Sequence, residues 1–301
     1  MFINIINYGD LMIYNSSLRR FVIGTLFLFV GVLLYKYPDN LVYSDDSNDG
    51  YVKGVYLGDK NDYVSLVNVS CSNNKDKVME VFECISNGKL PNGFVSYVPD
   101  GTKLISYSVG GSLLKLNFSK EFYNVSLDNE VKLIEMLVYS FTSIEGIDEL
   151  MLFVDGKLLN YLPNSNKVLP TILNRDYGIN KVIDIDSISN TVSFNVYYLG
   201  KEDEYYYIPI TYVMNNDNDV IEMIVRKLKN NGINSSLLTH LTSNVDVVSY
   251  NINDGNMDVL FNKELESIMK DSLLEEEIKY MLVMSFADSF DIDVSNIKIN
   301  F

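Results

Sequence analysis

The chain has 301 residues, a length that corresponds to about two domains at roughly 100–200 residues each. Apolar residues make up 47 %, enough for a sizeable core, which excludes a chain that is disordered throughout. The 24 Lys and Arg against 40 Asp and Glu give a net charge of −16. This excess argues against a nucleic-acid partner, because phosphate contacts need clustered basic side chains.

The first feature along the chain is an uncharged apolar run at 21–35, FVIGTLFLFVGVLLY, which Arg19 and Arg20 precede and Lys36 closes. As a helix rising about 1.5 Å per residue, it falls somewhat short of a hydrocarbon core of about 30 Å, and a snorkelling Lys36 or a thinner bilayer compensates. Paired arginines favour the cytoplasmic side. The run therefore predicts an uncleaved single-pass signal anchor, with the bulk of the chain outside the cytoplasm.

Two other interpretations of this run stay open. A cleaved signal peptide has the same basic-then-apolar order, although residues 1–50 contain no alanine for a small-residue cleavage site. A buried core helix is the second, although no apolar period marks it. The polar and acidic stretch that follows, at 36–50, predicts a tether that holds the rest of the chain away from the membrane.

Beyond the tether the sequence repeats itself. Five segments recur in the same order, and the distance between equivalent residues drifts only from 142 (Val55 to Tyr197) to 145 (Met136 to Met281). The paired segments are 55–58 with 197–200, 78–85 with 221–228, 104–109 with 247–252, 113–122 with 256–265, and 136–141 with 281–286. The repeat predicts two copies of one folding unit.

Each copy predicts the element order β-β-α-β-β-α-β, from alternating apolar residues in the strands and apolar residues at helical spacing in the helices. In the first copy these are strands near 51–56 and 63–70, a helix over 77–87, a hairpin at 104–118 turning at Gly110-Gly111, a helix near 128–143 that Asp128 caps, and a strand at 149–154. We expect an α+β fold in which the helices pack on one face of a mixed, mostly antiparallel sheet.

These observations divide the chain into six parts. They are a cytoplasmic N-terminus at 1–20, a transmembrane anchor at 21–35, a tether at 36–50, a first domain at 51–156, a connector at 157–192 and a second domain at 193–301. The connector holds apolar stretches at 169–173 and 179–185, too many for a flexible linker. We expect it to be ordered, with one short strand, and packed between the domains.

The paired units resemble tandem GerMN domains, the module of the GerM family of spore germination and sporulation proteins. The segments that carry the resemblance are the YLG strand, the hairpins at 103–122 and 247–265, the helices MLVYSF and MLVMSF, and the stretches at 150–157, 169–182 and 208–225. The resemblance implies an extracytoplasmic, membrane-attached protein with modules similar to the ring-building domains of envelope-spanning complexes. Family members are commonly lipid-anchored, whereas here an apolar run takes that place.

The candidates for chemistry are few. Glu121 and Glu264 recur in the two copies, and a carboxylate pair is what glycoside hydrolysis uses. One carboxylate in each domain indicates solvated strand ends instead, because a single active site is not expected to copy itself. His240 has no partner histidine, and the acidic runs at 45–46 and 275–277 lack the spacing of a calcium loop. We therefore predict no catalytic, metal or cofactor-binding residues, and no cofactor.

Whether Cys71 and Cys84 form a disulfide stays open at this level. Cys84 aligns with Lys227, which predicts an outward-facing helix position.

The predicted function is that of a membrane-anchored, non-enzymatic interaction protein. We expect envelope or sporulation-complex proteins as partners, with peptidoglycan or a second copy of the chain as further partners. Contacts would use sheet edges and helix faces, which tyrosines such as those at 205–207 suit, although a codon bias explains the tyrosines equally well. The alternative is a wall glycan-binding protein or wall-directed hydrolase with a groove between the domains.

Overall fold

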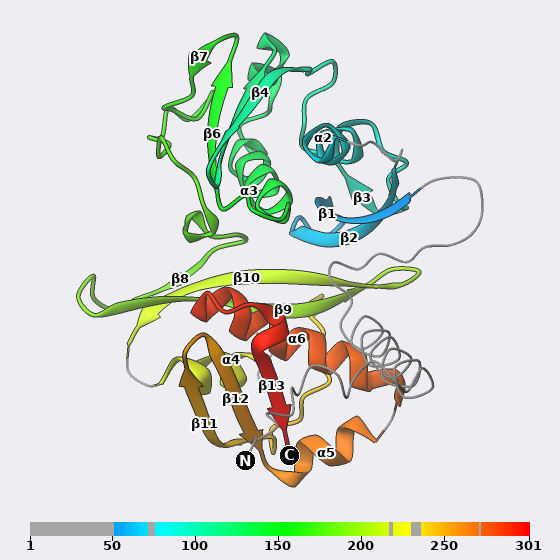
Figure 1. Ribbon diagram of the computed structural model, residues 1–301, viewed down its shortest axis with the longest axis vertical. Coiled ribbons are helices and arrows are strands. Elements are labelled where there is room, and N and C mark those ends of the chain that lie inside the picture. The colour runs from blue at the N-terminus through cyan, green and yellow to red at the C-terminus, as the bar shows by residue number, and fades with distance from the viewer. Residues whose placement is uncertain (1–50, 72–75, 217–218, 230–235, 271) are drawn as a thin grey trace, which may run out of the picture. The chain divides into compact units, whose positions relative to one another are not determined.

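The computed structural model describes residues 51–71, 76–216, 219–229, 236–270 and 272–301 (Figure 1). The predicted cytoplasmic segment, the anchor at 21–35 and the tether at 36–50 lie outside these residues. Within the described ranges, none of the helices has the length and apolar character needed to cross a membrane.

The first copy follows the predicted order, with a short extra strand. Its elements are β1 (Tyr51–Asp59), β2 (Val64–Cys71), α2 (Lys77–Asn87), β3 (Phe94–Val95), β4 (Leu104–Gly110), β5 (Leu113–Phe118), the 3-10 helix η2 (Lys120–Asn124), α3 (Glu130–Phe141) and β6 (Glu149–Val154). The prediction that Asp128 caps the second helix is wrong. Asn129 occupies the N-cap position without a side-chain bond, and residues 127–129 form a turn before the helix.

The second copy repeats this order, except that its described residues contain no strand counterpart of β3 and include an additional 3-10 helix before the last strand. Its elements are β9 (Thr191–Lys201), β10 (Tyr205–Asn215), α4 (Val220–Lys229), β11 (Val247–Asn253), β12 (Asn256–Phe261), α5 (Lys263–Met269), α6 (Ser272–Phe290), the 3-10 helix η4 (Val294–Asn296) and β13 (Ile297–Asn300). Where the first copy has η2, the second has the longer α5. The internal repeat is therefore present in the fold as well as in the sequence.

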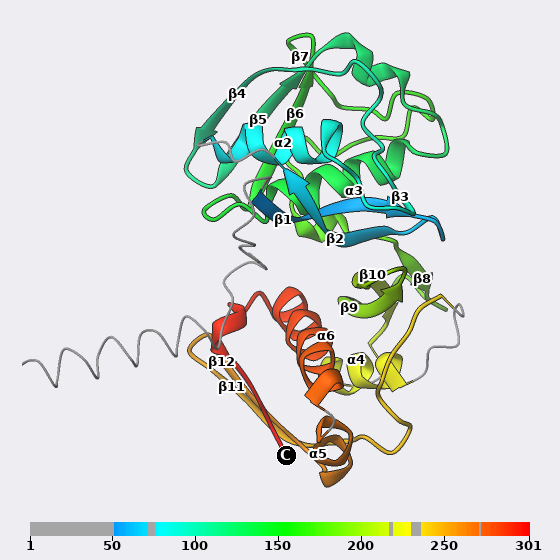
Figure 2. The same ribbon diagram turned by 90° about the vertical axis from the view of Figure 1, so that its right-hand side faces the viewer.

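The strands of each copy do not form the expected single sheet with helices on one face. The β1–β2 and β9–β10 hairpins belong to one shared six-stranded sheet, while β4–β5–β6–β7 and β11–β12–β13 form two separate sheets. Figures 1 and 2 show α2 and α3 between the shared sheet and the β4–β7 sheet, and α6 between the shared sheet and the β11–β13 sheet. The reason lies in α3, which buries residues around most of its circumference and so needs cover on both sides.

The connector is ordered and extends the shared sheet. It contains β7 (Lys157–Leu158), the 3-10 helix η3 (Arg175–Tyr177) and β8 (Val182–Asp184), and β8 pairs in parallel with β10. The two copies meet where β2 lies antiparallel to β10, with Leu66 opposite Tyr207.

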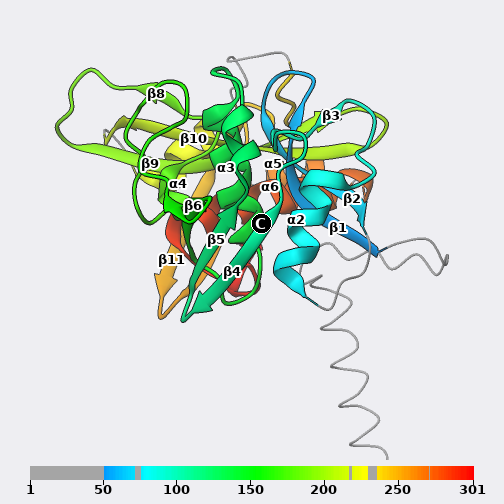
Figure 3. The ribbon, with the colours of Figure 1, turned by 90° about the horizontal axis from the view of Figure 1, so that it is seen from above.

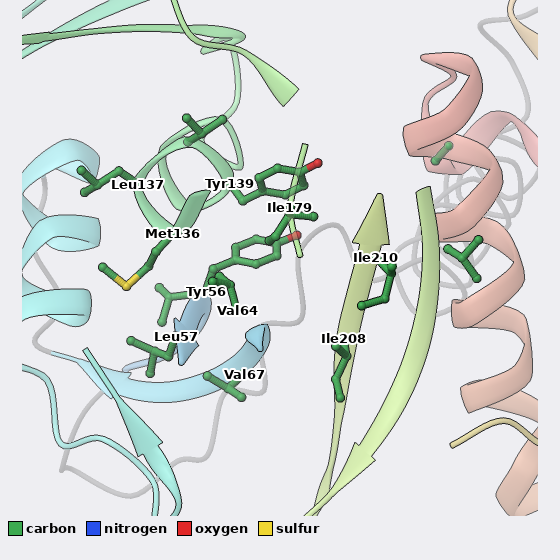
Figure 4. Packing of buried hydrophobic residues seen from close by; sticks show 14 of the residues in the cluster. Tyr56, Leu57, Val64, Val67, Met136, Leu137, Tyr139, Ile179, Ile208 and Ile210 are labelled. Carbon is green, nitrogen blue, oxygen red and sulfur yellow. The ribbon is translucent and has the colours of Figure 1, made fainter. Parts of the chain in front are cut away.

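The core beside this junction is aromatic and aliphatic. Tyr56 of β1 packs edge-on against Tyr139 of α3, with ring centroids 5.3 Å apart. Figure 4 shows these rings next to Leu57 and Met136, with Ile208 and Ile210 on β10. All six side chains are buried, so the first copy and β10 share one apolar core.

Candidate interaction surface

The two carboxylates weighed as a hydrolytic pair are not brought together. Glu121 lies on the exposed η2, and a hydrogen bond from the Ser119 side chain is the main cause that lowers its pKa. Glu264 lies in the first turn of α5 and accepts a hydrogen bond from Thr242 Oγ1 at 3.3 Å. Their elements follow strands of different sheets, which lie on opposite sides of the shared sheet (Figure 2).

The other polar candidates have ordinary surroundings. The His240 ring packs edge-on against Tyr205, with centroids 6.0 Å apart, and its Nε2 has no hydrogen-bond partner among the described residues. In the acidic run at 275–277, Glu275 pairs with Lys279 one helical turn later. No group of three or more potential metal ligands occurs in the part of the chain that the structure describes.

Cys71 and Cys84 form a disulfide that joins the end of β2 to α2, with their Cα atoms 5.4 Å apart. The predicted outward position of Cys84 is wrong, since the side chain is fully buried. The helix turns this position toward β2, and the aligned Lys227 reaches over an aromatic ring at the corresponding place in the second copy.

The junction between the copies is closed by the connector residue Asn180. Its side-chain amide donates to the carbonyls of Val64 in β2 and Pro209 in β10, each at 2.8 Å, and its Oδ1 accepts from the Val64 N–H at 2.8 Å. The Asn180 N–H donates to Oε2 of Glu135 at 3.1 Å. Asn180 adopts a left-handed backbone with φ of 47°, which asparagine tolerates better than most residues. The Asn180 side chain thus forms hydrogen bonds to strands of both copies.

A second connector residue, Arg175, links α3 of the first copy to α6 of the second. Its guanidinium donates to Thr142 Oγ1 and Ser143 Oγ at the end of α3, both at 3.1 Å, and to Asp288 Oδ1 of α6 at 2.6 Å. The Tyr197 hydroxyl donates to the other oxygen of Asp288. Because the Asp288 side chain is only 9 % exposed, these two donors replace hydrogen bonds that water would otherwise make to it. Hydrogen-bonded side chains from both copies therefore meet at this joint.

One pocket lies between α4 and the start of β11, away from this joint. Glu222, Arg226, Lys229 and Asp246 contribute most of its polar lining.

Among the described residues, the most distinctive surface is formed by the free edges of β4 and β11. Each strand is the outer strand of its sheet, and each exposes a row of large apolar side chains. The rows occupy equivalent positions and consist of Ile105, Tyr107 and Val109 in β4 and Val248, Tyr250 and Ile252 in β11. Tyr107 lies opposite the buried Leu116, so the row continues the core face of the sheet past the helices that cover it.

The same contact fixes both rows to the protein. Tyr107 donates its hydroxyl hydrogen to Asp76, the N-cap residue of α2, at 2.5 Å. Tyr250 donates in the same way to Asp219, which precedes α4. This pairing was missed in the sequence, although an Asp followed 31 residues later by a Tyr recurs in both copies. The tyrosines hold each edge strand in place while both residues stay partly exposed to solvent.

Chemically, the surface offers what a protein partner uses. An edge strand presents unpaired main-chain N–H and C=O groups, and natural sheets usually protect such edges with charges, proline or bulges. Neither β4 nor β11 contains a charge or a proline, and only a bulge near Ile105 and one near Val248 interrupt them.

Comparison with known proteins agrees with the duplicated fold. The family described as "Germane: Sporulation and spore germination" matches residues 51–160 and 195–301. The spore germination protein GerM of Bacillus subtilis is 27 % identical over 270 residues, which covers 85 % of this chain and 74 % of the relative. The solved tandem GerMN domains of that sporulation protein superpose with a TM-score of 0.71 at 24 % identity, over 83 % of this chain and 90 % of theirs. The chain is therefore a member of the Germane family with two GerMN domains in tandem.

Proposed function

We propose that this chain is a non-enzymatic structural protein of the cell envelope. The run at 21–35 holds the chain in the membrane as an uncleaved signal anchor. The two GerMN domains lie outside the cytoplasm and assemble with sporulation or germination complexes. Support comes from the family and from the germination protein GerM, its relative.

One observation carries the interaction role. The same unprotected apolar edge occurs in both copies, held by the same Tyr–Asp hydrogen bond, although the charges around it differ. Two copies of one fold must both keep their buried apolar residues. They need not both keep a row of exposed apolar residues, because exposed positions tolerate polar side chains. The joint made by Arg175 and Asn180 holds both edges on one rigid support.

A complementation experiment in the organism that carries this chain tests the role. Deletion of its gene is expected to lower the yield of heat-resistant spores or the fraction that germinates, and the wild-type chain restores it. The edge variant Ile105→Asp with Val248→Asp should fail to restore it, since both positions are exposed and the fold tolerates the change.

The matched control is Glu121→Gln with Glu264→Gln, which should complement fully. If this control fails and the edge variant succeeds, the wall-directed hydrolase replaces the present proposal. If deletion affects neither spores nor germination, the sporulation role is wrong.

The anchor is tested separately on protoplasts, which have lost the cell wall but keep an intact membrane. External protease should degrade the tagged C-terminal part of the wild-type chain. The variant Leu26→Arg with Leu28→Arg should become protected, since each central arginine costs about 2.5–3.5 kcal/mol in membrane insertion. Protection of the wild-type chain would exclude the extracytoplasmic location.

A further inference from the structure

The two edge hairpins carry opposite charges. The hairpin at 103–118 contains Lys103 and Lys115 and no carboxylate. The hairpin at 246–261 contains Asp246, Asp254 and Asp258 and no basic residue. Two of these charges are inverted at equivalent positions, Lys103 with Asp246 and Lys115 with Asp258. The fold itself does not require this inversion, since both hairpins pair and bury the same residues.

Each free edge also carries a carboxylate from the helix side, Asp76 at Tyr107 and Asp219 at Tyr250, so the contrast between the edges comes from the charges of the hairpins themselves. Lys298 lies beside Asp258 on β13, and Glu149 lies beside Leu113 on β6, and both are on the side of the hairpin away from its free edge. Asp246 pairs with Lys229 at 2.7 Å, yet its side chain remains 66 % exposed.

An antiparallel pairing of β4 with β11 sets side chains of the same kind opposite each other, and the bulges near Ile105 and Val248 fall at the two flanking pairs. With Tyr107 opposite Tyr250, the flanking pairs are Ile105 with Ile252 and Val109 with Val248. Opposed aromatic and β-branched residues are the favourable cross-strand pairs. The same register sets Lys103 opposite Asp254, and Ser108 opposite Ser249 on the other face.

Pairing of like edges is less favourable. Two β11 strands that pair antiparallel about Tyr250 set Asp246 opposite Asp254 at both ends, and like charges directly opposite are destabilising. Two β4 strands set Lys103 opposite Gly111 and gain no ion pair.

One chain cannot satisfy its own edges. The β4–β7 and β11–β13 sheets lie on opposite sides of the shared sheet (Figures 1 and 2). Seen from above, the turn ends of both hairpins point the same way (Figure 3), so the two strands run in a similar direction within a chain. A second copy, turned around, brings its β11 antiparallel to β4.

We propose that the chain assembles with itself, β4 of one copy pairing antiparallel with β11 of the next, with Tyr107 opposite Tyr250. The contact joins two different surfaces and is therefore heterologous, so its repetition builds a ring or a filament. This inference deepens the proposed structural role and rests on it for its biological meaning. The self-contact itself is measured without spores, so the two proposals can fail separately.

Disulfide trapping tests the register in the full-length chain. Opposed residues of an antiparallel pair have Cα atoms about 4.5–5.5 Å apart, within the range of a disulfide. Ser108→Cys and Ser249→Cys are both exposed, and both native cysteines are already bonded to each other. Under mild oxidation a mixture of these two variants should give covalent dimers, whereas either variant alone should stay monomeric under denaturing conditions.

Ser108→Cys mixed with Asn251→Cys is the matched control, because that pair meets only in a parallel or slipped register. A yield equal to that of the Ser249→Cys mixture overturns the register. Dimers of Ser108→Cys alone would show that like edges pair, and the absence of dimers from all mixtures overturns the self-assembly.

Charge reversal provides an independent test by sedimentation of the full-length chain. Lys103→Glu sets a carboxylate opposite Asp254, and Asp254→Lys sets an ammonium opposite Lys103, so each variant alone places like charges at the pair that the register brings together. Each variant alone should associate at least about tenfold more weakly than wild type, because like charges at an interface oppose docking. Mixing the two should restore association, a result that misfolded variants would not give. Unchanged association in both variants, or no recovery on mixing, contradicts the proposal.

Discussion

The two GerMN domains have the same fold, but different contacts join the first helix to the first hairpin in each. In the first copy the disulfide between Cys71 and Cys84 joins β2 to α2. In the second copy the Lys227 ammonium lies 4.6 Å from the centroid of the Tyr212 ring, and the Tyr198 hydroxyl donates to the Lys227 carbonyl at 3.1 Å. The fold therefore requires that this helix be held, but not by one particular bond.

Other contacts are the same in both copies and mark what the fold does require. The serine of MLVYSF, Ser140, accepts a hydrogen bond from the backbone N–H of Tyr56 in β1 at 3.1 Å. The serine of MLVMSF, Ser285, accepts from the N–H of Tyr197 in β9 at 2.9 Å. Both serines are buried, and each satisfies a main-chain donor of the outermost long strand in its copy.

The largest expected effect breaks the joint between the copies. Arg175→Met leaves Asp288 buried with one of its two donors gone, and breaking a buried ion pair costs about 3–5 kcal/mol. We expect about 3 kcal/mol, since the Arg175 side chain keeps 28 % exposure. Urea unfolding of the full-length chain measures the loss.

Lys279→Met, which removes the exposed pair with Glu275, serves as the control and should cost less than about 0.5 kcal/mol. Equal losses in the two variants would mean that Arg175 does not hold the copies together.

Removal of the disulfide tests whether the two helix links are equivalent. The cysteines are 13 residues apart, and closing a loop of about this size contributes about 3 kcal/mol. Cys71→Ala with Cys84→Ala should therefore destabilise the first copy by that amount. Lys227→Met in the second copy should cost about 0.5–1 kcal/mol, the usual size of a cation–π contact.

Hydrogen exchange, read separately for α2 and α4, assigns each loss to its copy. Faster exchange in α4 than in α2 after the cysteine change would contradict the assignment.

The two copies differ at an equivalent position of α3 and α6, where only the first copy has a carboxyl group. Glu135 on α3 aligns with Tyr280 on α6, and burial raises the pKa of Glu135 to about 7, while the Asn180 N–H and Lys181 partly oppose this. A folded-state pKa above the unfolded value means that the stabilising contribution is complete below about pH 4.5 and is lost as the pH rises through about 7.

Glu135→Gln should therefore raise stability at pH 8 by on the order of 2–3 kcal/mol relative to wild type, with little difference near pH 4.5. Melting curves of both proteins across this range measure it. A constant difference between the two proteins at all pH values would show that the carboxyl does not titrate in this window.

The two serines at equivalent positions should respond alike in both copies. Ser140→Ala and Ser285→Ala each leave a buried backbone N–H without its acceptor, at a cost of about 1–3 kcal/mol. We expect the lower half of this range for both, because only one bond is lost. Denaturant unfolding compares the two variants, and a difference above about 1 kcal/mol would mean that the two serines are not structural equivalents.

Much of this fold was predictable from the duplication, because apolar spacing and turn residues are local signals. The YLG strand recurs for a physical reason, since a Cβ at Gly58 or Gly200 would collide with the ring of Tyr97 or Tyr206. The division into three sheets was not predictable, because nothing local distinguishes a helix covered on one side from α3, which is covered on two. The joint made by Arg175 and Asn180 depends on partners that are far apart in sequence. The sequence marks these two residues only by their place in the connector, which resembles that of the family.

The smallest expected effect concerns the edge tyrosines, which are shared by both copies. Tyr107→Phe and Tyr250→Phe remove hydroxyls from exposed contacts, so the free energy of unfolding should change by less than about 0.5 kcal/mol. The local effect should still be visible, because the hydrogen bond from Tyr107 is the main cause that lowers the pKa of Asp76. In the Tyr107→Phe variant the pKa of Asp76, followed by NMR, should rise toward its ordinary value. A large loss of stability would instead mean that these tyrosines are retained for folding, which would remove the argument that the exposed edges were kept for contact with another chain.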